Sequence, residues 1–158
     1  DPVTMETLGG VRSDAVTRAF LDEKTAHWQA HGHGMWMFDA QEDGRFIGRS
    51  LLEYIEVGGE RALEVGYSVI APAWGKGYAT EMARALVAIA FSLPRVDEIV
   101  SFTWPHNVAS RRVMEKAGFQ YERTVAHVGQ AHVVYRLRRS EFGGEPSLHV
   151  VDGSLVVK

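Results

Sequence analysis

The order of hydrophobic patterns along the 158-residue chain predicts an α+β fold, with one mixed, largely antiparallel sheet flanked by helices. Short apolar runs separated by turn residues fill 35–70, which is typical of an antiparallel meander. Longer stretches with a helical period then occupy 77–92 and 107–118. Two further apolar runs follow, so we expect the chain to close its sheet with a hairpin.

The first elements are a helix and three strands. Ser13 is placed to cap a helix over 13–30. The side chains expected near one face of this helix are Val16, Phe20, His27 and Trp28. The three strands are expected at 35–40, 45–57 and 61–70, with the turn sequences QEDG and GGE between them.

The second half is expected to alternate helices and strands. The helix over 77–92 carries apolar residues at helical spacing, and Pro94 ends it. Beyond it we expect a strand, a short helix and two hairpin strands, over 96–103, 107–118, 119–128 and 131–139. Asn107 is placed to cap the short helix at its start, and Gly118 at its end.

Composition and charge exclude several classes of protein. The formal net charge is -3, so neither nucleic acid nor an anionic membrane is an expected partner. The absence of cysteine excludes a disulfide framework, a thiolate zinc site and a cysteine nucleophile. The sequence also shows no secretory signal and no apolar run long enough to span a bilayer, so we expect a cytoplasmic protein.

A glycine-rich turn opens the helix over 77–92. Gly75 and Gly77 flank Lys76 there, and glycine lets the backbone approach a ligand closely. The first N–H groups of a helix lack internal partners and carry positive partial charge, so the turn fits an anion such as phosphate. A plain tight turn is the alternative. The spacing of a Walker loop is absent, and a Rossmann fingerprint would need a third glycine where Thr80 stands.

Two blocks of the chain resemble the GNAT superfamily of N-acetyltransferases: GYSVIAPAWGKGYATEMARALVAIAF and FTWPHNVASRRVMEKAGF. The resemblance is closest to the branch of the RimJ/RimL-type ribosomal-protein N-terminal acetyltransferases, and covers roughly residues 5–140. The family's usual Gln or Arg before the first glycine is Trp74 here. The family also begins with a strand and a helix ahead of Asp1. We therefore expect one acetyltransferase domain over 1–142 without those elements, then a linker and hairpin-like tail over 143–158.

The resemblance implies that acetyl-CoA is the cofactor, that its pyrophosphate fills the glycine turn, and that no metal takes part. The residues it implies for binding are Val69, Ile70, Gly75, Lys76, Gly77, Tyr78, Ala79, Thr80 and Asn107. Amides from Gly75 to Thr80 would cradle the pyrophosphate, and Asn107 would contact the pantetheine as well as cap its helix. Val69 and Ile70 would pair with the pantetheine through main-chain groups. A bulge there would part the strand from its neighbour and leave a slot for the thioester.

Acetyl transfer to an amine needs a base for the amine and a proton for the departing thiolate. Glu64 is the candidate base, which the resemblance supports; a solvated or ion-paired glutamate is the alternative. Ser110 is the candidate acid, since helical spacing places it with Met114 on an inward stripe. The resemblance sets this serine where other members use a tyrosine, and a bond to its own helix backbone is the alternative. Without a cysteine, direct attack on acetyl-CoA is the simplest mechanism.

No recognisable motif encodes the amine acceptor. An α-amine has a pKa of about 7.7–8.0, against about 10.4 for lysine. More of it is therefore already neutral at physiological pH, and a weaker base is enough to deprotonate the rest. We therefore place a protein or peptide N-terminus first and a small-molecule amine second. A catalytically idle acyl-CoA-binding module is the alternative from another class. A homodimer is left open, because the tail over 143–158 could add strands to a neighbour.

Other polar residues suggest local roles. The HGHG stretch at 31–34 is expected to be a polar loop near the acceptor mouth rather than a metal site. His127 and His132 bracket the last hairpin and could face each other. Five arginines would either gather near the 3′-phosphate of coenzyme A or form a solvated face: Arg111, Arg112, Arg136, Arg138 and Arg139.

Overall fold

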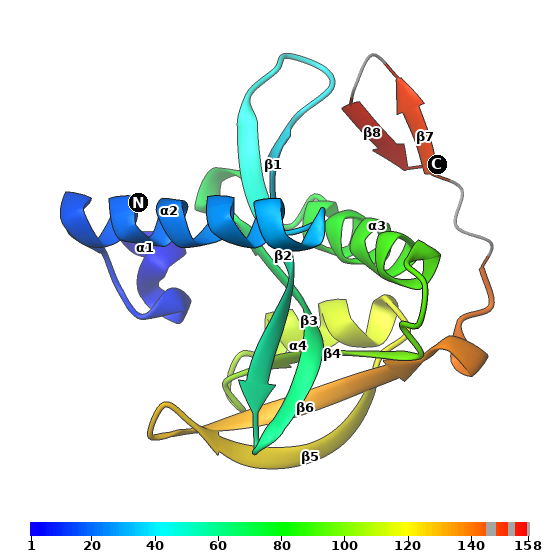
Figure 1. The fold of residues 1–158 in the computed structure, drawn as a ribbon. Coiled ribbons are helices and arrows are strands. Elements are labelled where there is room, and N and C mark those ends of the chain that lie inside the picture. The colour runs from blue at the N-terminus through cyan, green and yellow to red at the C-terminus, as the bar shows by residue number, and fades with distance from the viewer. Residues whose placement is uncertain (145–147, 152–153, 158) are drawn as a thin grey trace.

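The computed structural model describes residues 1–144, 148–151 and 154–157, and it confirms the predicted α+β class (Figure 1). One sheet has the strand order β1-β2-β3-β4-β6-β5. Its strands are β1 (Met35–Asp39), β2 (Phe46–Val57), β3 (Glu60–Val69), β4 (Glu98–Thr103), β5 (Gln120–His127) and β6 (Gln130–Arg138). Neighbouring strands are antiparallel except β3 and β4, which are parallel. The sheet is therefore mixed and largely antiparallel, as expected.

The helices lie close to their predicted positions. They are α1 (Pro2–Met5), α2 (Asp14–His31), α3 (Tyr78–Ser92) and α4 (Val108–Lys116), and the short 3-10 turns are η1 (Glu6–Leu8), η2 (Ala71–Ala73) and η3 (Arg139–Glu141). Ser13 caps α2 as predicted, because its side chain accepts a hydrogen bond from the Val16 amide at 3.4 Å. α3 ends at Ser92, two residues before Pro94, and Asn107 caps α4.

The centre of the core lies between α3 and the sheet. α3 buries Leu86 and Ala90 against Leu63 and Val65 of β3. Its many alanines allow the helix backbone to approach the strands closely. Because α3 follows β3 directly, this packing fixes the glycine turn between them at the end of β3.

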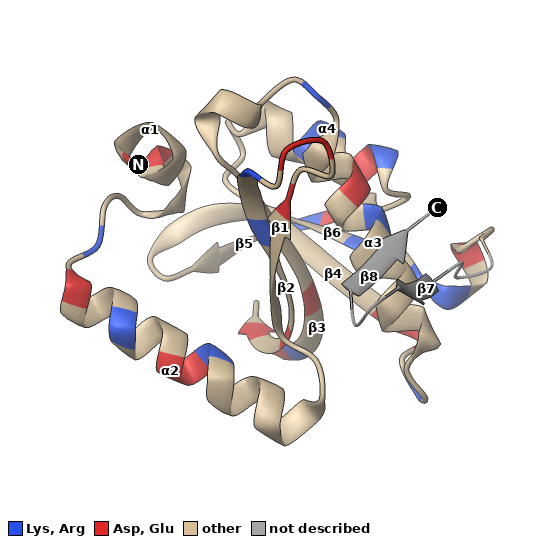
Figure 2. Cartoon of the chain, turned by 90° about the horizontal axis from the view of Figure 1, so that it is seen from above, with Lys and Arg blue, Asp and Glu red and all other residues tan. Residues whose placement is uncertain are grey.

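Helix α2 covers the sheet less completely than its sequence pattern predicts. Val16, expected on the apolar face, is 52% exposed, whereas Trp28 packs on Trp36 and donates its indole N–H to the Met35 carbonyl at 2.9 Å. Figure 2 shows acidic and basic residues alternating along the helix. One of them, Lys24, is buried beneath it. The helix therefore brings a charged group to the sheet as well as an apolar one.

Strands β3 and β4 are paired at a single position and then diverge. β3 pairs with β2 in continuous register from Val57↔Glu60 to Gly48↔Val69, so this pairing shows none of the register shift that the expected bulge would cause. With β4, in contrast, β3 makes one paired position, Glu64↔Val100. The predicted slot is present, but it arises where two parallel strands diverge rather than at a bulge.

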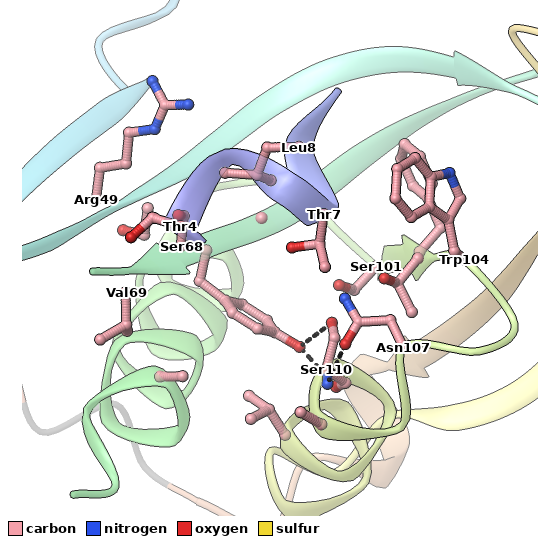
Figure 3. Close-up of a pocket in the computed structure, with 18 of the residues that line it drawn as sticks. Thr4, Thr7, Leu8, Arg49, Ser68, Val69, Ser101, Trp104, Asn107 and Ser110 are labelled. Carbon is pink, nitrogen blue, oxygen red and sulfur yellow. Dashed lines mark hydrogen bonds between the residues drawn. The ribbon is translucent and has the colours of Figure 1, made fainter. Parts of the chain in front are cut away.

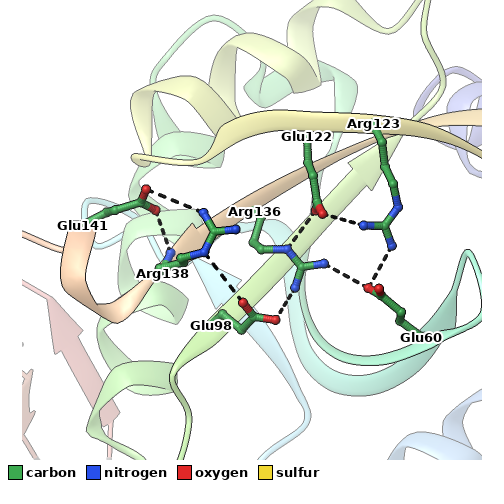
Figure 4. A network of polar contacts seen from close by, with 7 residues as sticks. All are labelled: Glu60, Glu98, Glu122, Arg123, Arg136, Arg138 and Glu141. Carbon is green, nitrogen blue, oxygen red and sulfur yellow. Dashed lines mark hydrogen bonds and ion pairs between the residues drawn. The ribbon is translucent and has the colours of Figure 1, made fainter.

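Most of the arginines near the end of the chain are satisfied within the protein. Arg136 contacts Glu60, Glu98 and Glu122 from three neighbouring strands, and it is buried (Figure 4). Arg136 therefore fits neither the predicted phosphate cluster nor a solvated face. Arg139 donates to the carbonyls of Phe91, Leu93 and Val96, Arg138 lies near Glu98 and Glu141, and Arg111 donates to the Tyr135 hydroxyl.

The tail forms a unit of its own. β7 (Leu148–Val151) and β8 (Ser154–Val157) pair antiparallel in a separate two-stranded sheet. Residues 152–153, where the sequence predicts the turn of this hairpin, lie outside the described residues. Within the described part of the chain, no helix is both long and apolar enough to cross a membrane.

Candidate active site

A cleft of about 1220 Å³ opens where β3 and β4 part. Figure 3 shows Thr4, Ser68 and Arg49 toward one side of it and Ser101 and Trp104 toward the other. The predicted site residues that line the cleft are Glu64, Val69, Gly75, Gly77, Tyr78, Ala79, Thr80, Asn107 and Ser110. Two further predicted residues, Ile70 and Lys76, do not line it. The fold thus brings most of the predicted site together from β3, α3 and α4.

The glycine turn has the form that an anion site requires. Gly75 and Gly77 adopt φ values of 76° and 90°, which disfavour any residue with a side chain. A Cβ at either position would meet no protein atom within 4 Å, so the constraint is backbone conformation rather than space. Among the described residues, the amides from Gly75 to Ala79 donate to no other group, while the Thr80 amide donates to Gly77 O at 3.0 Å. The open amides sit at the N-terminus of α3 and can bind a phosphate.

The parted edge of β3 offers main-chain groups to a ligand. The Ile70 amide donates to the Ile47 carbonyl at 3.0 Å, so the backbone of Ile70 is directed toward β2. Backbone groups alternate sides along a strand, so those of Tyr67 and Val69 are directed toward the parted side. The Val69 carbonyl already accepts the Trp74 indole N–H at 2.7 Å. The main-chain groups of Val69 can therefore pair with a ligand, as predicted, and those of Tyr67 can do so as well. The Ile70 amide cannot, because it is already bonded to β2.

Glu64 stands at the point where the strands part. Its side chain lines the cleft and has no hydrogen-bond partner among the described residues. Burial, together with the negative charge of Glu53 directly opposite on β2, raises the pKa of Glu64 to about 7. The positive charge of Lys24, whose Nζ binds Glu53 at 2.6 Å, opposes this rise. Glu64 is therefore an unpaired carboxylate that can take up a proton near neutral pH.

Two hydroxyl groups meet on the other side of the slot. The Asn107 side chain accepts the Ser110 amide at 3.1 Å, which fixes the first turn of α4. The Tyr67 hydroxyl donates to the Ser110 carbonyl at 2.9 Å and lies 3.1 Å from Ser110 Oγ (Figure 3). Burial raises the pKa of Tyr67, so its hydroxyl stays protonated. Tyr67 was not among the predicted site residues. The sequence does show a tyrosine in the strand that leads to the glycine turn. It lies three residues after Glu64, so its side chain is on the opposite face of the strand.

The histidines are placed partly as expected. His33 of the HGHG stretch is buried, and its Nδ1 hydrogen-bonds the Leu52 carbonyl at 2.8 Å, so it belongs to the core rather than to a polar loop. The rings of His127 and His132 lie 5.4 Å apart at 89°, which confirms that they face each other, and both line the cleft. Among the described residues, no group of three or more His, Cys, Asp or Glu side chains could hold a metal ion.

Residues 1–120 match the family model described as Acetyltransferase (GNAT) domain. The chain belongs to the GNAT acetyltransferase family. Membership confirms the predicted class of enzyme, an N-acetyltransferase. The matched range includes the glycine turn, Glu64 and α4.

Known GNAT and related proteins support the same fold. The chain is 27% identical to YkkB of Bacillus subtilis over 85% of this chain and 78% of YkkB. It is 28% identical to the solved acetyltransferase of Agrobacterium tumefaciens, with a TM-score of 0.73 over 85% and 78% of the two chains. It is 25% identical to aminoglycoside acetyltransferase AAC(6')-Ib solved with coenzyme A, with a TM-score of 0.69 over 87% and 83%. Other curated relatives match over less than half of their length.

The relatives agree with some predictions and not with others. Coenzyme A or acetyl-CoA is present in solved GNAT relatives, in agreement with the predicted cofactor. The residues of this GNAT chain fit such a group, because the unpaired amides of the glycine turn and the parted edge of β3 open into one cleft. Named relatives are N-acetyltransferases of several kinds, including aminoglycoside acetyltransferases, and none supports the RimJ/RimL branch.

Replacing Gly77 should weaken acetyl-CoA binding without unfolding this GNAT domain. Gly77→Val disfavours the φ of 90° and adds a side chain that faces open space rather than protein. We expect the affinity measured by calorimetry to fall at least about tenfold, or about 1.4 kcal/mol. Gly59→Val is the matched control, since Gly59 has a φ of 81°, equally open space and no place in the cleft. Unchanged binding by a folded Gly77→Val protein would exclude the glycine turn as the phosphate site.

Proposed function

We propose that this enzyme transfers the acetyl group of acetyl-CoA directly to a weakly basic primary amine, with Glu64 as the base. The observation that carries the proposal is the unpaired carboxylate of Glu64, which has a pKa of about 7 and lies at the head of the slot between β3 and β4. A base works best when its pKa is near the working pH. A carboxylate at the ordinary value near 4.5 would be a much weaker acceptor for an ammonium proton.

The chain's own groups would hold the cofactor in an extended form. The amides from Gly75 to Ala79 would bind the pyrophosphate, and the backbone of Tyr67 and Val69 would pair with the pantetheine. Bound acetyl-CoA supplies an acetyl thioester with a thiolate leaving group. The pantetheine would thus take the place that β4 leaves free, and the thioester would lie between Glu64 and the hydroxyls of α4 and β3.

The two sides of the slot would carry out the two proton transfers of the reaction. Glu64 accepts a proton from the ammonium form of the acceptor, directly or through one water, so that the neutral nitrogen can bond to the acetyl carbon. As the C–S bond breaks, Ser110 Oγ donates a proton to the departing sulfur and takes up the second proton that the acetylated nitrogen loses. The Tyr67 hydroxyl, 3.1 Å away, can replace Ser110 in this role. Both groups donate only while protonated, which the raised pKa of Tyr67 favours.

Two classes of acceptor share this chemistry. The N-terminal amine of a protein or peptide has the low basicity that suits a base with a pKa near 7. A small-molecule amine is the second candidate, and it is favoured by the solved relative AAC(6')-Ib, whose complexes include kanamycin. The cytoplasm is the proposed location for either reaction. A homodimer remains a separate proposal.

Glu64→Gln should slow the reaction in a pH-dependent way. Glu64 is ionised above pH about 7, and an α-amine becomes mostly neutral above pH about 8. Loss of the base should therefore matter most near pH 7 to 8, and the mutant should recover much of the wild-type kcat/KM by pH 9.5. The measurement is kcat/KM from pH 6.5 to 9.5, with an acceptor found by screening amines for release of free thiol.

The control for this experiment is Glu56→Gln, an exposed glutamate on β2 outside the cleft. It should track the wild type at every pH. Glu53 and Lys24 face Glu64 from β2 and α2, so both stay unchanged in these variants. A ratio of Glu64→Gln to wild type that stays flat across the range would mean that Glu64 is not the base. A lysine-like acceptor would instead delay recovery to pH above about 10.

Ser110→Ala should lower kcat roughly 10²-fold with little change in acetyl-CoA affinity, because it removes the proposed acid. Tyr67→Phe keeps the ring and removes the partner hydroxyl. If the two hydroxyls act as one unit, the double variant should be about as slow as the slower single variant. Ser92→Ala is the control, because the Ser92 hydroxyl donates to the Ile89 carbonyl at 2.7 Å and Ser92 does not line the cleft. A loss below about threefold for Ser110→Ala would return Ser110 to a structural role.

A further inference from the structure

Two arginines share one aromatic ring at the edge of the cleft. The guanidinium carbons of Arg12 and Arg49 lie 5.0 and 4.8 Å from the centre of the Phe20 ring on α2. Both side chains line the cleft, and neither has an ion pair or hydrogen bond to another described residue. Two like charges gathered in this way repel each other unless an anion lies between or beside them.

The pair lies on the face of the sheet that carries the proposed base. Arg49 stands opposite Ser68 in the β2–β3 register, and Glu53 on the same face stands opposite Glu64. The Phe20 ring also lies 5.0 Å from Nζ of Lys24, the residue that holds Glu53. The two arginines therefore lie on the same face of the sheet as Glu64, opposite the face that packs against α3. We expect the acceptor to bind on this face.

The charges that line the cleft are unbalanced. Glu64 is the one carboxylate among its described lining residues, and its pKa near 7 leaves it partly protonated at neutral pH. The cationic side chains in the lining are Arg12, Arg49, Arg112 and Lys116. Arg112 and Lys116 belong to α4, whereas Arg12 and Arg49 lie on the face of the sheet that carries Glu64. Burial and the charge of Arg12 lower the pKa of Arg49.

We propose that the acceptor is a small amine that also carries a carboxylate or phosphate group, and that Arg12 and Arg49 bind this group. The inference rests on the proposed acetyl transfer in the same cleft. Guanidinium groups bind carboxylate and phosphate oxygens with paired, charge-assisted hydrogen bonds. An anion held there would neutralise the arginine pair while the amine reaches toward Glu64.

The same charges disfavour a polycationic acceptor such as an aminoglycoside. A polyamine would meet two guanidinium groups, and among the described lining residues Glu64 alone would supply a carboxylate for its several ammonium groups. The N-terminal segment also narrows the site. Thr4 is fixed to the end of β3 by a 2.9 Å hydrogen bond from the Ala71 amide, and Thr7 and Leu8 lie over the cleft (Figure 3). The segment therefore forms part of the wall of the cleft, and we expect it to favour a compact acceptor.

Paired acceptors test the proposal with the full chain and acetyl-CoA. Each pair shares its amine and differs in the anion: phosphoethanolamine against ethanolamine, and leucine against leucinamide, with kanamycin as the polycation. Rates are expressed per neutral amine, so that basicity does not decide the comparison. We expect the anionic member of at least one pair to have a kcat/KM at least about tenfold higher, and kanamycin to be the poorest acceptor. A preference for the neutral members or for kanamycin would overturn the proposal.

Arg12→Gln and Arg49→Gln identify the groups responsible. Each should raise KM for the preferred anionic acceptor about tenfold or more, while kcat and acetyl-CoA affinity change little. Arg61→Gln is the matched control, because Arg61 lies 4.6 Å over the Tyr54 ring and does not line the cleft. Loss of acetyl-CoA affinity with an intact acceptor preference would assign the arginines to the cofactor and refute the proposal.

A binding experiment decides the matter even if no amine is acetylated, in which case the proposed transfer itself fails. With coenzyme A saturating, N-acetylleucine and N-acetylleucinamide are titrated by calorimetry. The wild type should bind the carboxylate compound at least about tenfold more tightly, and Arg49→Gln should lose this preference. Equal binding of the two compounds, or equal binding by Arg49→Gln and the wild type, would show that the arginines hold no anion.

Discussion

The site depends on one constraint, the divergence of β3 and β4 after a single paired position. Glu64↔Val100 is the one position at which the two strands pair. Beyond it, the backbone of β3 has a neighbouring strand on one side only, which is β2. Unpaired main-chain groups inside a protein need partners. The cleft supplies the space for one, and the glycine turn directly after β3 supplies amides for a phosphate at its end. The cofactor of a GNAT enzyme can complete the sheet at this point.

The charges around Glu64 give the slot its chemistry. Lys24 and Glu53 form a buried pair beneath α2, and Glu53 stands directly opposite Glu64 across the β2–β3 register. Glu64 is partly buried, lies opposite the carboxylate of Glu53, and accepts no hydrogen bond from another described residue. Burial and the charge of Glu53 raise its pKa to about 7. On the same face, Arg12 and Arg49 form no ion pair with another residue that the structure describes. The same sheet face thus carries the proposed base and the two arginines that we propose bind an anion.

The features that depend on local sequence were predicted well, and those that depend on tertiary contacts were not. Helix caps and turns follow from residue type, so most elements and the turn that opens α3 were correctly predicted. Tyr67 was missed because its contact with Ser110 joins β3 to α4 across 43 residues. The direction of the Ile70 amide depends on pairing with β2, and the stacking of Arg12 and Arg49 on Phe20 depends on where α2 lies. No pattern along the chain encodes these contacts.

Residue-resolved amide hydrogen exchange, with and without saturating coenzyme A, tests the central claim most directly. If the pantetheine takes the place that β4 leaves free, the amides of Tyr67 and Val69 should become strongly protected when coenzyme A binds. The amides of Ser68 and Ile70 are directed toward β2 and should change little, so they serve as internal references. Tight binding of coenzyme A with no added protection at Tyr67 and Val69 would contradict the account.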